Sequence, residues 1–190
     1  SNSILLPRRS SEDRSKTYQI ALNTQIKKYI ANGSKGNLNL SGTPIRSLPK
    51  DIQVNGDLNV SHTQIQSLPD NLKVGGSLIL NNTQIQSLPD NLVVDGSLDV
   101  SDTPIESLPN NLTVGGRLMA SGTNIRSLPN NLKVGGSLIL NLNNTQILSL
   151  ADSNLKVGDG LFLQDTPLAK THTVDEIKGV IQYIGGNIFI

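Results

Sequence analysis

The chain repeats itself every 20 residues through most of its length, and this period constrains the fold more than any other feature. A threonine, an isoleucine, a Leu-Pro pair, a valine and a glycine each recur at fixed places in the period. The threonine series is Thr43, Thr63, Thr83, Thr103 and Thr123. Such a repeat is typical of solenoids, in which one unit cannot bury its apolar side alone and must stack on its neighbours. We therefore predict a stack of similar coils.

The order of residues inside one period indicates a coil with two short extended sides. In Leu78-Ile79-Leu80, alternation directs the leucines inward and the isoleucine outward, as in a β-strand. Leu92 and Val94 form a second extended segment on the far side of the same coil. We expect the repeated threonine to follow the strand at the bend and to point inward. We expect glycine pairs such as Gly75-Gly76 to supply the positive φ of a tight corner.

The written pattern of the unit, L-x-(L/V)-x-x-T-x-I, resembles the core of the leucine-rich repeats, with threonine where that family usually has asparagine. The resemblance covers residues 36–169 and is to short repeats of bacterial or bacteriophage type. It implies a mainly β, right-handed, leucine-rich-repeat-like solenoid of about seven coils. It also implies that the threonine, in place of that asparagine, satisfies backbone groups of adjacent coils, and that the strand face is concave and binds a partner. The chain's last residues resemble the ends of repeat proteins carried by tailed bacteriophages, which favours a phage origin.

The two ends of the chain differ from the repeat and predict caps for the solenoid. Residues 12 to 31 place Tyr18, Leu22, Ile26 and Tyr29 or Ile30 on one face of a helix. Ser10 or Ser11 is expected to cap its start, and Asn32-Gly33 to end it. Near the other end, the pattern from Thr173 to Glu176 is a capping box for a short helix through about Tyr183, before a final strand at residues 187–190. The predicted parts of one domain are thus 1–35, 36–169 and 170–190.

The repeat is irregular once, between Leu140 and Val157. Residues 141–144 add two positions before Thr145, and a later segment loses its proline and gains a residue. We predict a bulged or looped-out coil there, with its strand still in register.

Composition favours a cytoplasmic protein that binds neither nucleic acid nor membrane. Cysteine is absent, which excludes disulfides and thiolate metal sites. Sixteen basic and 15 acidic residues leave a net charge of +1, too small a field to attract nucleic acid or anionic lipid. No apolar run approaches the ~20 residues of a membrane span, and the first residues lack the order of a signal peptide.

The sequence contains no pattern typical of catalysis, so we predict a protein that is not an enzyme and has no cofactor or metal. The two histidines, His62 and His172, are expected to lie in solvent. A serine recurs with the repeat and is therefore expected to be structural, since no single serine stands beside a base. Regular threonines also occur on ice-binding solenoids, but the single rank here favours an interior ladder.

Residues that vary between coils are expected to carry specificity, while those that recur carry the fold. The outward position of the first strand varies most and includes several apolar side chains. The predicted partner-binding residues are Ile79, Asp99, Arg117, Met119, Ile139 and Phe162. An apolar stripe with a polar border is typical of a protein-binding face. The alternative is a solvated sheet, or one covered by the terminal helices. The opposite face, with Lys73, Lys133 and Lys156, is expected to be merely solvated.

We therefore expect a non-catalytic protein-binding module, in a phage an inhibitor of a bacterial host protein such as a defence factor. Two other functions stay open from the sequence: a structural, surface or virion repeat protein, and the recognition part of a larger effector enzyme. Self-association of the solenoids through their strand faces also stays open.

Overall fold

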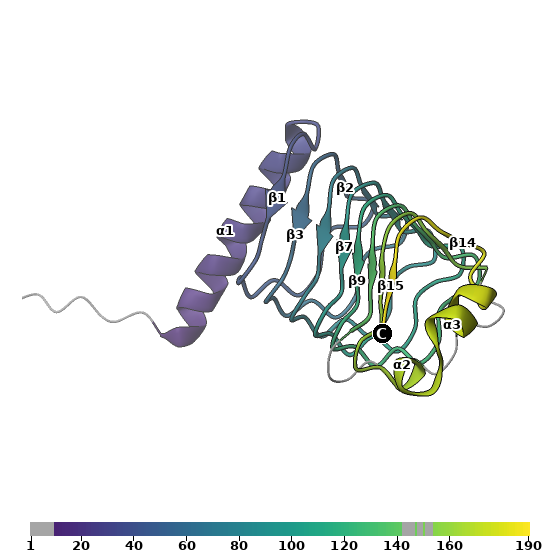
Figure 1. Ribbon diagram of the computed structural model, residues 1–190. Helices are drawn as coiled ribbons and strands as arrows, with labels where there is room; N and C mark the ends of the chain where they lie inside the picture. The colour runs from purple at the N-terminus through teal and green to yellow at the C-terminus, as the bar shows by residue number, and fades with distance from the viewer. Residues whose placement is uncertain (1–9, 142–146, 148–149, 151–153) are drawn as a thin grey trace, which may run out of the picture.

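The protein is a parallel β-solenoid with a helical cap at its N-terminal end and two short helices near its C-terminal end (Figure 1). The computed structural model describes residues 10–141, Ile147, Leu150 and residues 154–190. Within these residues every coil contributes one strand to each of two parallel sheets. The predicted architecture is confirmed.

The strands of the two sheets are all two residues long and pair only with the equivalent strands of neighbouring coils. The eight-stranded sheet comprises β1 (Leu38–Asn39), β3 (Leu58–Asn59), β5 (Leu78–Ile79), β7 (Leu98–Asp99), β9 (Leu118–Met119), β11 (Leu138–Ile139), β13 (Leu161–Phe162) and β15 (Ile188–Phe189). The seven-stranded sheet comprises β2 (Gln53–Val54), β4 (Lys73–Val74), β6 (Val93–Val94), β8 (Thr113–Val114), β10 (Lys133–Val134), β12 (Lys156–Val157) and β14 (Tyr183–Ile184). Six turns of the solenoid separate β1 from β13, and a seventh turn, which contains two helices, leads to β15.

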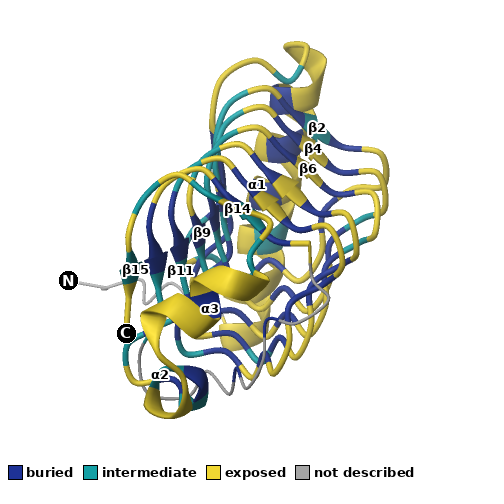
Figure 2. Ribbon diagram, turned by 45° about the vertical axis from the view of Figure 1, so that its right-hand side comes forward, coloured by how far each residue is buried: buried dark blue, intermediate teal, exposed yellow. Residues whose placement is uncertain are grey.

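A single aliphatic core runs along the axis of the solenoid between the two sheets. In the coil that begins at β5, Leu78, Leu80, Ile85, Leu92 and Val94 are all buried. Equivalent residues of successive coils stack, so the inward positions form continuous rows (Figure 2). Each side chain of this kind stabilises the fold by about 1.5–3 kcal/mol before chain entropy is subtracted.

The threonine ladder is buried, which confirms the interior interpretation. Thr83, Thr123 and Thr166 have no exposed surface, and Thr63 and Thr103 have little. Each hydroxyl donates to the carbonyl three residues earlier, as Thr83 Oγ1 does to Leu80 O at 2.7 Å. The expected bond to an adjacent coil is therefore wrong. The threonine instead stabilises the bend that ends each strand of its own coil.

The repeated corner glycines do not have positive φ, so that prediction is wrong; their role is to allow close approach between coils. Positive φ occurs at other turn positions, for example Asn71, Asn111 and Asn131. A Cβ on Gly96 would lie 2.6 Å from the carbonyl carbon of Gly76 in the preceding coil. A Cβ on Gly115 would overlap the carbonyl oxygen of Asp95. Because the neighbouring atoms are backbone, they cannot rotate away, and a Cβ at Gly96 or Gly115 would require the two coils to shift.

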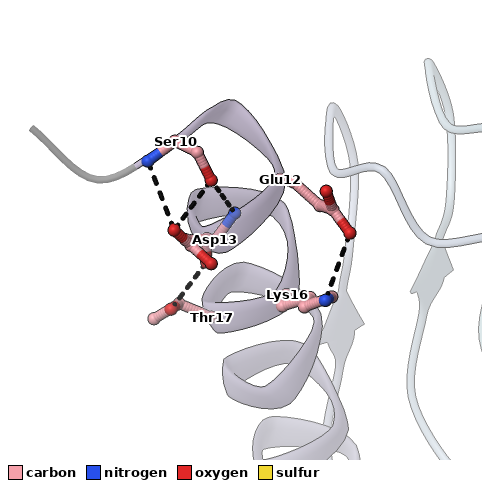
Figure 3. Close-up of polar contacts among 5 residues, drawn as sticks. All are labelled: Ser10, Glu12, Asp13, Lys16 and Thr17. Atoms are coloured by element: carbon pink, nitrogen blue, oxygen red, sulfur yellow. Dashed lines mark hydrogen bonds and ion pairs between the residues drawn. The ribbon is translucent and has the colours of Figure 1, made fainter.

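Helix α1 (Ser11–Ala31) caps the N-terminal end of the stack. Ser10 is its N-cap, and Ser10 and Asp13 form a reciprocal capping box (Figure 3). Leu22, Ile26 and Tyr29 are buried against the first coil, as predicted. Of the alternatives Tyr29 and Ile30, Tyr29 is the buried one, whereas Tyr18 is 46% exposed and does not share the buried face as predicted. Tyr18 lies one turn before the segment that packs on the coil.

The hydroxyl of Tyr29 fastens this cap to the chain that leads into β1. It lies 2.6 Å from the carbonyl oxygen of Ser34 and 2.9 Å from that of Gly36. Burial raises the pKa of Tyr29, an effect partly opposed by a hydrogen bond from the backbone of Asn55. The predicted end of the helix is confirmed at Asn32.

The C-terminal region is more complex than the sequence indicated. The capping box of Thr173 and Glu176 is confirmed, but α3 (Val174–Val180) ends three residues before Tyr183. Tyr183 and Ile184 instead form β14, because they continue the seven-stranded sheet beside β12. A second short helix, α2 (Pro167–Thr171), starts at an N-cap, Thr166, and was not predicted. The final strand is confirmed as β15.

The strands on both sides of the irregular segment keep their register, as predicted. Ile139 pairs with Phe162, and Lys133 pairs with Lys156. The predicted bulge at residues 141–144 lies almost wholly outside the described residues. Among the described residues, no helix is long and apolar enough to cross a membrane.

Replacing a corner glycine should destabilise the stack far more than replacing a helical glycine. We expect Gly96→Ala to lower the free energy of unfolding by about 1–3 kcal/mol, because its Cβ would lie 2.6 Å from the backbone of Gly76. The control is Gly179→Ala in α3, where a Cβ meets nothing within 4 Å, and alanine should be neutral or stabilise by up to about 1 kcal/mol. Denaturant unfolding measures both; equal effects would contradict the close-approach explanation.

The start of α3 should loosen as pH falls through the titration of Glu176. Hydrogen bonds from the backbone N–H and the hydroxyl of Thr173 lower the pKa of Glu176. Because the folded pKa lies below the unfolded one, the carboxylate's contribution is present above the unfolded pKa and lost as pH falls through the folded value. The amide resonance of Thr173 in NMR should titrate at a midpoint below that of an exposed glutamate. Glu176→Gln should abolish this titration.

Candidate partner-binding face

The eight-stranded sheet aligns most of the predicted partner-binding residues in one column. Ile79 pairs with Asp99, Asp99 with Met119, Met119 with Ile139, and Ile139 with Phe162. Each is the second residue of its strand and points away from the core, where its side chain is half-buried. Neighbouring strands lie about 4.8 Å apart, so the column is continuous. Arg117 lies two residues before Met119 at the start of β9 and is exposed.

Phe189 extends this column by one strand and is a member that the sequence analysis missed. It pairs with Phe162, and the two rings stack with centroids 4.4 Å apart and 11° between their planes. Phe189 remains 38% exposed. The alternation of residues 187–190 was visible in the sequence. The pairing was not, because the step from β13 to β15 contains both C-terminal helices.

A glycine fixes the position of the aromatic pair. A Cβ on Gly160 would lie 2.9 Å from Cε2 of Phe162 and 3.3 Å from Cε2 of Phe189. The two rings therefore lie over the backbone of Gly160, in space that any other residue would occupy. We define the partner-binding face as Ile79, Arg117, Met119, Ile139, Phe162 and Phe189.

Asp99 lies in the column but is engaged in the fold. Its Oδ1 accepts a hydrogen bond of 2.9 Å from the backbone N–H of Ser101. Asn39 and Asn59 occupy the same position in the first coils and accept equivalent bonds from Ser41 and Ser61. The polar residues of the column thus stabilise the turn after each strand. The four apolar residues Met119, Ile139, Phe162 and Phe189 form an uninterrupted stripe on adjacent strands.

Arg117 interrupts a ladder of hydrogen bonds between coils. At this position, each side chain accepts a bond from the backbone N–H of the next coil. Asp57 Oδ1 accepts from Ser77 at 2.7 Å, Ser77 Oγ from Ser97 at 3.1 Å, and Ser97 Oγ from Arg117 at 3.0 Å. A guanidinium has no acceptor, so Arg117 cannot bond the N–H of Ser137. In the described part of the chain, its charge also forms no ion pair.

The described residues contain no arrangement typical of a metal or catalytic centre. No group of three or more histidine, aspartate or glutamate side chains could hold a metal ion among them. His62 is exposed at a turn with a φ of 54°. His172 is exposed too, and its Nδ1 lies 2.8 Å from the hydroxyl of Thr171.

Comparison with known proteins adds no family assignment. No protein-family model matches this chain, and no curated protein is significantly similar to it. The 20-residue parallel solenoid is therefore established by the repeat and the fold alone.

Restoring the ladder at Arg117 should stabilise the protein. We expect Arg117→Ser to raise the free energy of unfolding by about 0.5–1.5 kcal/mol, because the serine hydroxyl can accept from the N–H of Ser137. The matched control is Ser97→Ala, which removes the acceptor for Arg117 N and should destabilise by a similar amount. Denaturant unfolding measures both variants. A destabilised Arg117→Ser variant would show that the arginine has a structural role instead.

Proposed function

We propose that the protein is a non-catalytic binding module that recognises a protein partner through the partner-binding face. The observation that carries this proposal is the apolar stripe on four adjacent strands, Met119, Ile139, Phe162 and Phe189, held in register on the outside of the sheet. These apolar side chains are only partly buried in the fold, whereas burial against a partner would remove the rest of their surface from water.

The surroundings of the stripe match the anatomy of a protein interface. Aromatic and arginine side chains contribute most often to binding energy, and here a stacked phenylalanine pair and an unpaired Arg117 lie on one face. Partly exposed serine and asparagine side chains beside these strands, such as Ser97, Ser101 and Asn141, form a polar border. A dry apolar centre within a polar rim is the usual arrangement.

The proposed phage origin and the proposed host partner rest on the sequence resemblance to leucine-rich-repeat proteins. A leucine-rich-repeat protein of bacteriophage origin, acting in the host cytoplasm, would bind a host protein such as a defence factor. A structural repeat protein would need only the buried ladders. The apolar stripe and the interrupted ladder at Arg117 favour recognition over a purely structural role.

Replacing the stripe with the polar residue that other coils carry should abolish partner binding and spare the fold. Asn39 and Asn59 occupy the same position in β1 and β3, so Met119→Asn, Ile139→Asn and Phe162→Asn place a compatible side chain there. We expect this triple variant to lose capture of a bacterial partner in affinity purification and to keep the circular dichroism spectrum of the wild type. At least roughly a hundredfold loss of affinity is expected from three interface residues of this kind.

The control carries changes on the seven-stranded sheet. Val93→Asn and Thr113→Asn alter outward positions of β6 and β8 and should leave capture intact. Capture lost equally in both variants, or retained in the triple variant, would contradict the proposed face. A folded triple variant that still binds the partner would show that another surface of the protein makes the contact.

A further inference from the structure

A polar groove of about 350 Å³ lies over the C-terminal half of the seven-stranded sheet, away from the partner-binding face. All the side chains that line it are polar. They include a row of amides, Asn111, Asn131 and Asn154, and an outward column, Thr113, Lys133 and Lys156. The sequence alone indicated a solvated surface here, since the lysines seemed scattered among other residues.

The amide row is preorganised by hydrogen bonds between coils. Asn131 Nδ2 donates to Asn111 Oδ1 at 2.9 Å, and Asn154 Nδ2 donates to Asn131 Oδ1 at 3.2 Å. Each bond uses one of the two hydrogens of the donor amide and one of the two lone pairs of the acceptor oxygen, so both kinds of group keep free capacity. The row therefore offers both N–H donors and carbonyl acceptors, as sugar hydroxyls require.

Two lysines bring positive charge to the same groove. Lys133 and Lys156 are directly paired on β10 and β12, so their chains leave the sheet about 4.8 Å apart. Within the described residues neither forms an ion pair. Like charges placed opposite each other destabilise a sheet, and a bound anion would remove this repulsion. Lys73, by contrast, pairs with Gln53 and Val93.

An exposed tyrosine continues the lysine column. Tyr183 pairs with Lys156 and is 57% exposed. Tyr183 does not line the groove itself, but it follows the lining residue Gln182 and offers a flat apolar ring on the strand next to Lys156. Apolar ring, amide donors and cations together match the three kinds of surface on an acidic sugar: the C–H face of the ring, the hydroxyl oxygens and the carboxylate or sulfate.

We propose that this groove binds an anionic saccharide. The Asn131 and Asn154 amides donate to hydroxyl oxygens, Lys133 and Lys156 pair with the acidic groups, and Tyr183 packs against a sugar ring. This site lies on the other sheet from the partner-binding face, so it stands independently of the proposed protein recognition.

Calorimetric titration with a hexamer of galacturonate tests the proposal, with the fully methyl-esterified hexamer as the neutral ligand. We expect the wild type to bind the acid form, and the double variant Lys133→Gln, Lys156→Gln to bind it at least roughly tenfold more weakly. The charge-matched control, Lys73→Gln with Lys170→Gln, should bind within about twofold of the wild type. Tyr183→Ala should also weaken binding, whereas Tyr18→Ala, at the exposed tyrosine of α1, should not.

Three results would overturn the assignment. The first is no binding of the acid hexamer by the wild type. The second is equal binding of the acid and neutral hexamers, or equal losses in the two charge variants. The third is inorganic phosphate binding as tightly as the hexamer with no effect of Tyr183→Ala, which would leave a simple oxyanion site. Thermal unfolding of each variant, expected to match the wild type, excludes loss of the fold as the cause.

Discussion

The structure depends on the backbone contact between one coil and the next, repeated without offset every 20 residues. Short parallel strands supply few hydrogen bonds each, so the coils must approach closely along their whole contour. The corner glycines make this possible, since a side chain at Gly96 or Gly115 would meet the backbone of the preceding coil. Everything else in the fold, including the stacking of the aliphatic core, requires this spacing.

Because the coils stack in strict register, each outward side chain lies next to the side chain at the same position of the next coil. Outward positions therefore become straight columns, and a few substitutions build an extended surface. On one sheet, apolar residues at four adjacent strands make a stripe. On the other, Lys133 and Lys156 become neighbours. The apolar stripe and the pair of lysines both lie in the C-terminal half of the solenoid.

The side chains that stabilise the stack can be separated from those that do not. Thr83 satisfies a carbonyl of its own coil, Ser77 and Ser97 satisfy N–H groups of the next, and Asp99 holds the turn after its strand. The side chain of Arg117 accepts no hydrogen bond from the next coil, although a serine at this position could accept one. A residue that gives up a hydrogen bond between coils is better explained by an interaction outside the fold.

The 20-residue period by itself determined the solenoid, the two sheets and the buried threonines, because alternation and stacking follow from the residues of each unit. The period also placed Ile79, Met119, Ile139 and Phe162 on one face. The capping helices lie outside the repeat and are predicted by helical periodicity at one end and a capping box at the other. Only the tertiary structure decided what depends on contacts between coils: the reason for the corner glycines, the role of Asp99, and β14 in place of a longer helix. The same contacts brought Phe189 onto Phe162, since a pairing across two helices leaves no periodic signal in the sequence.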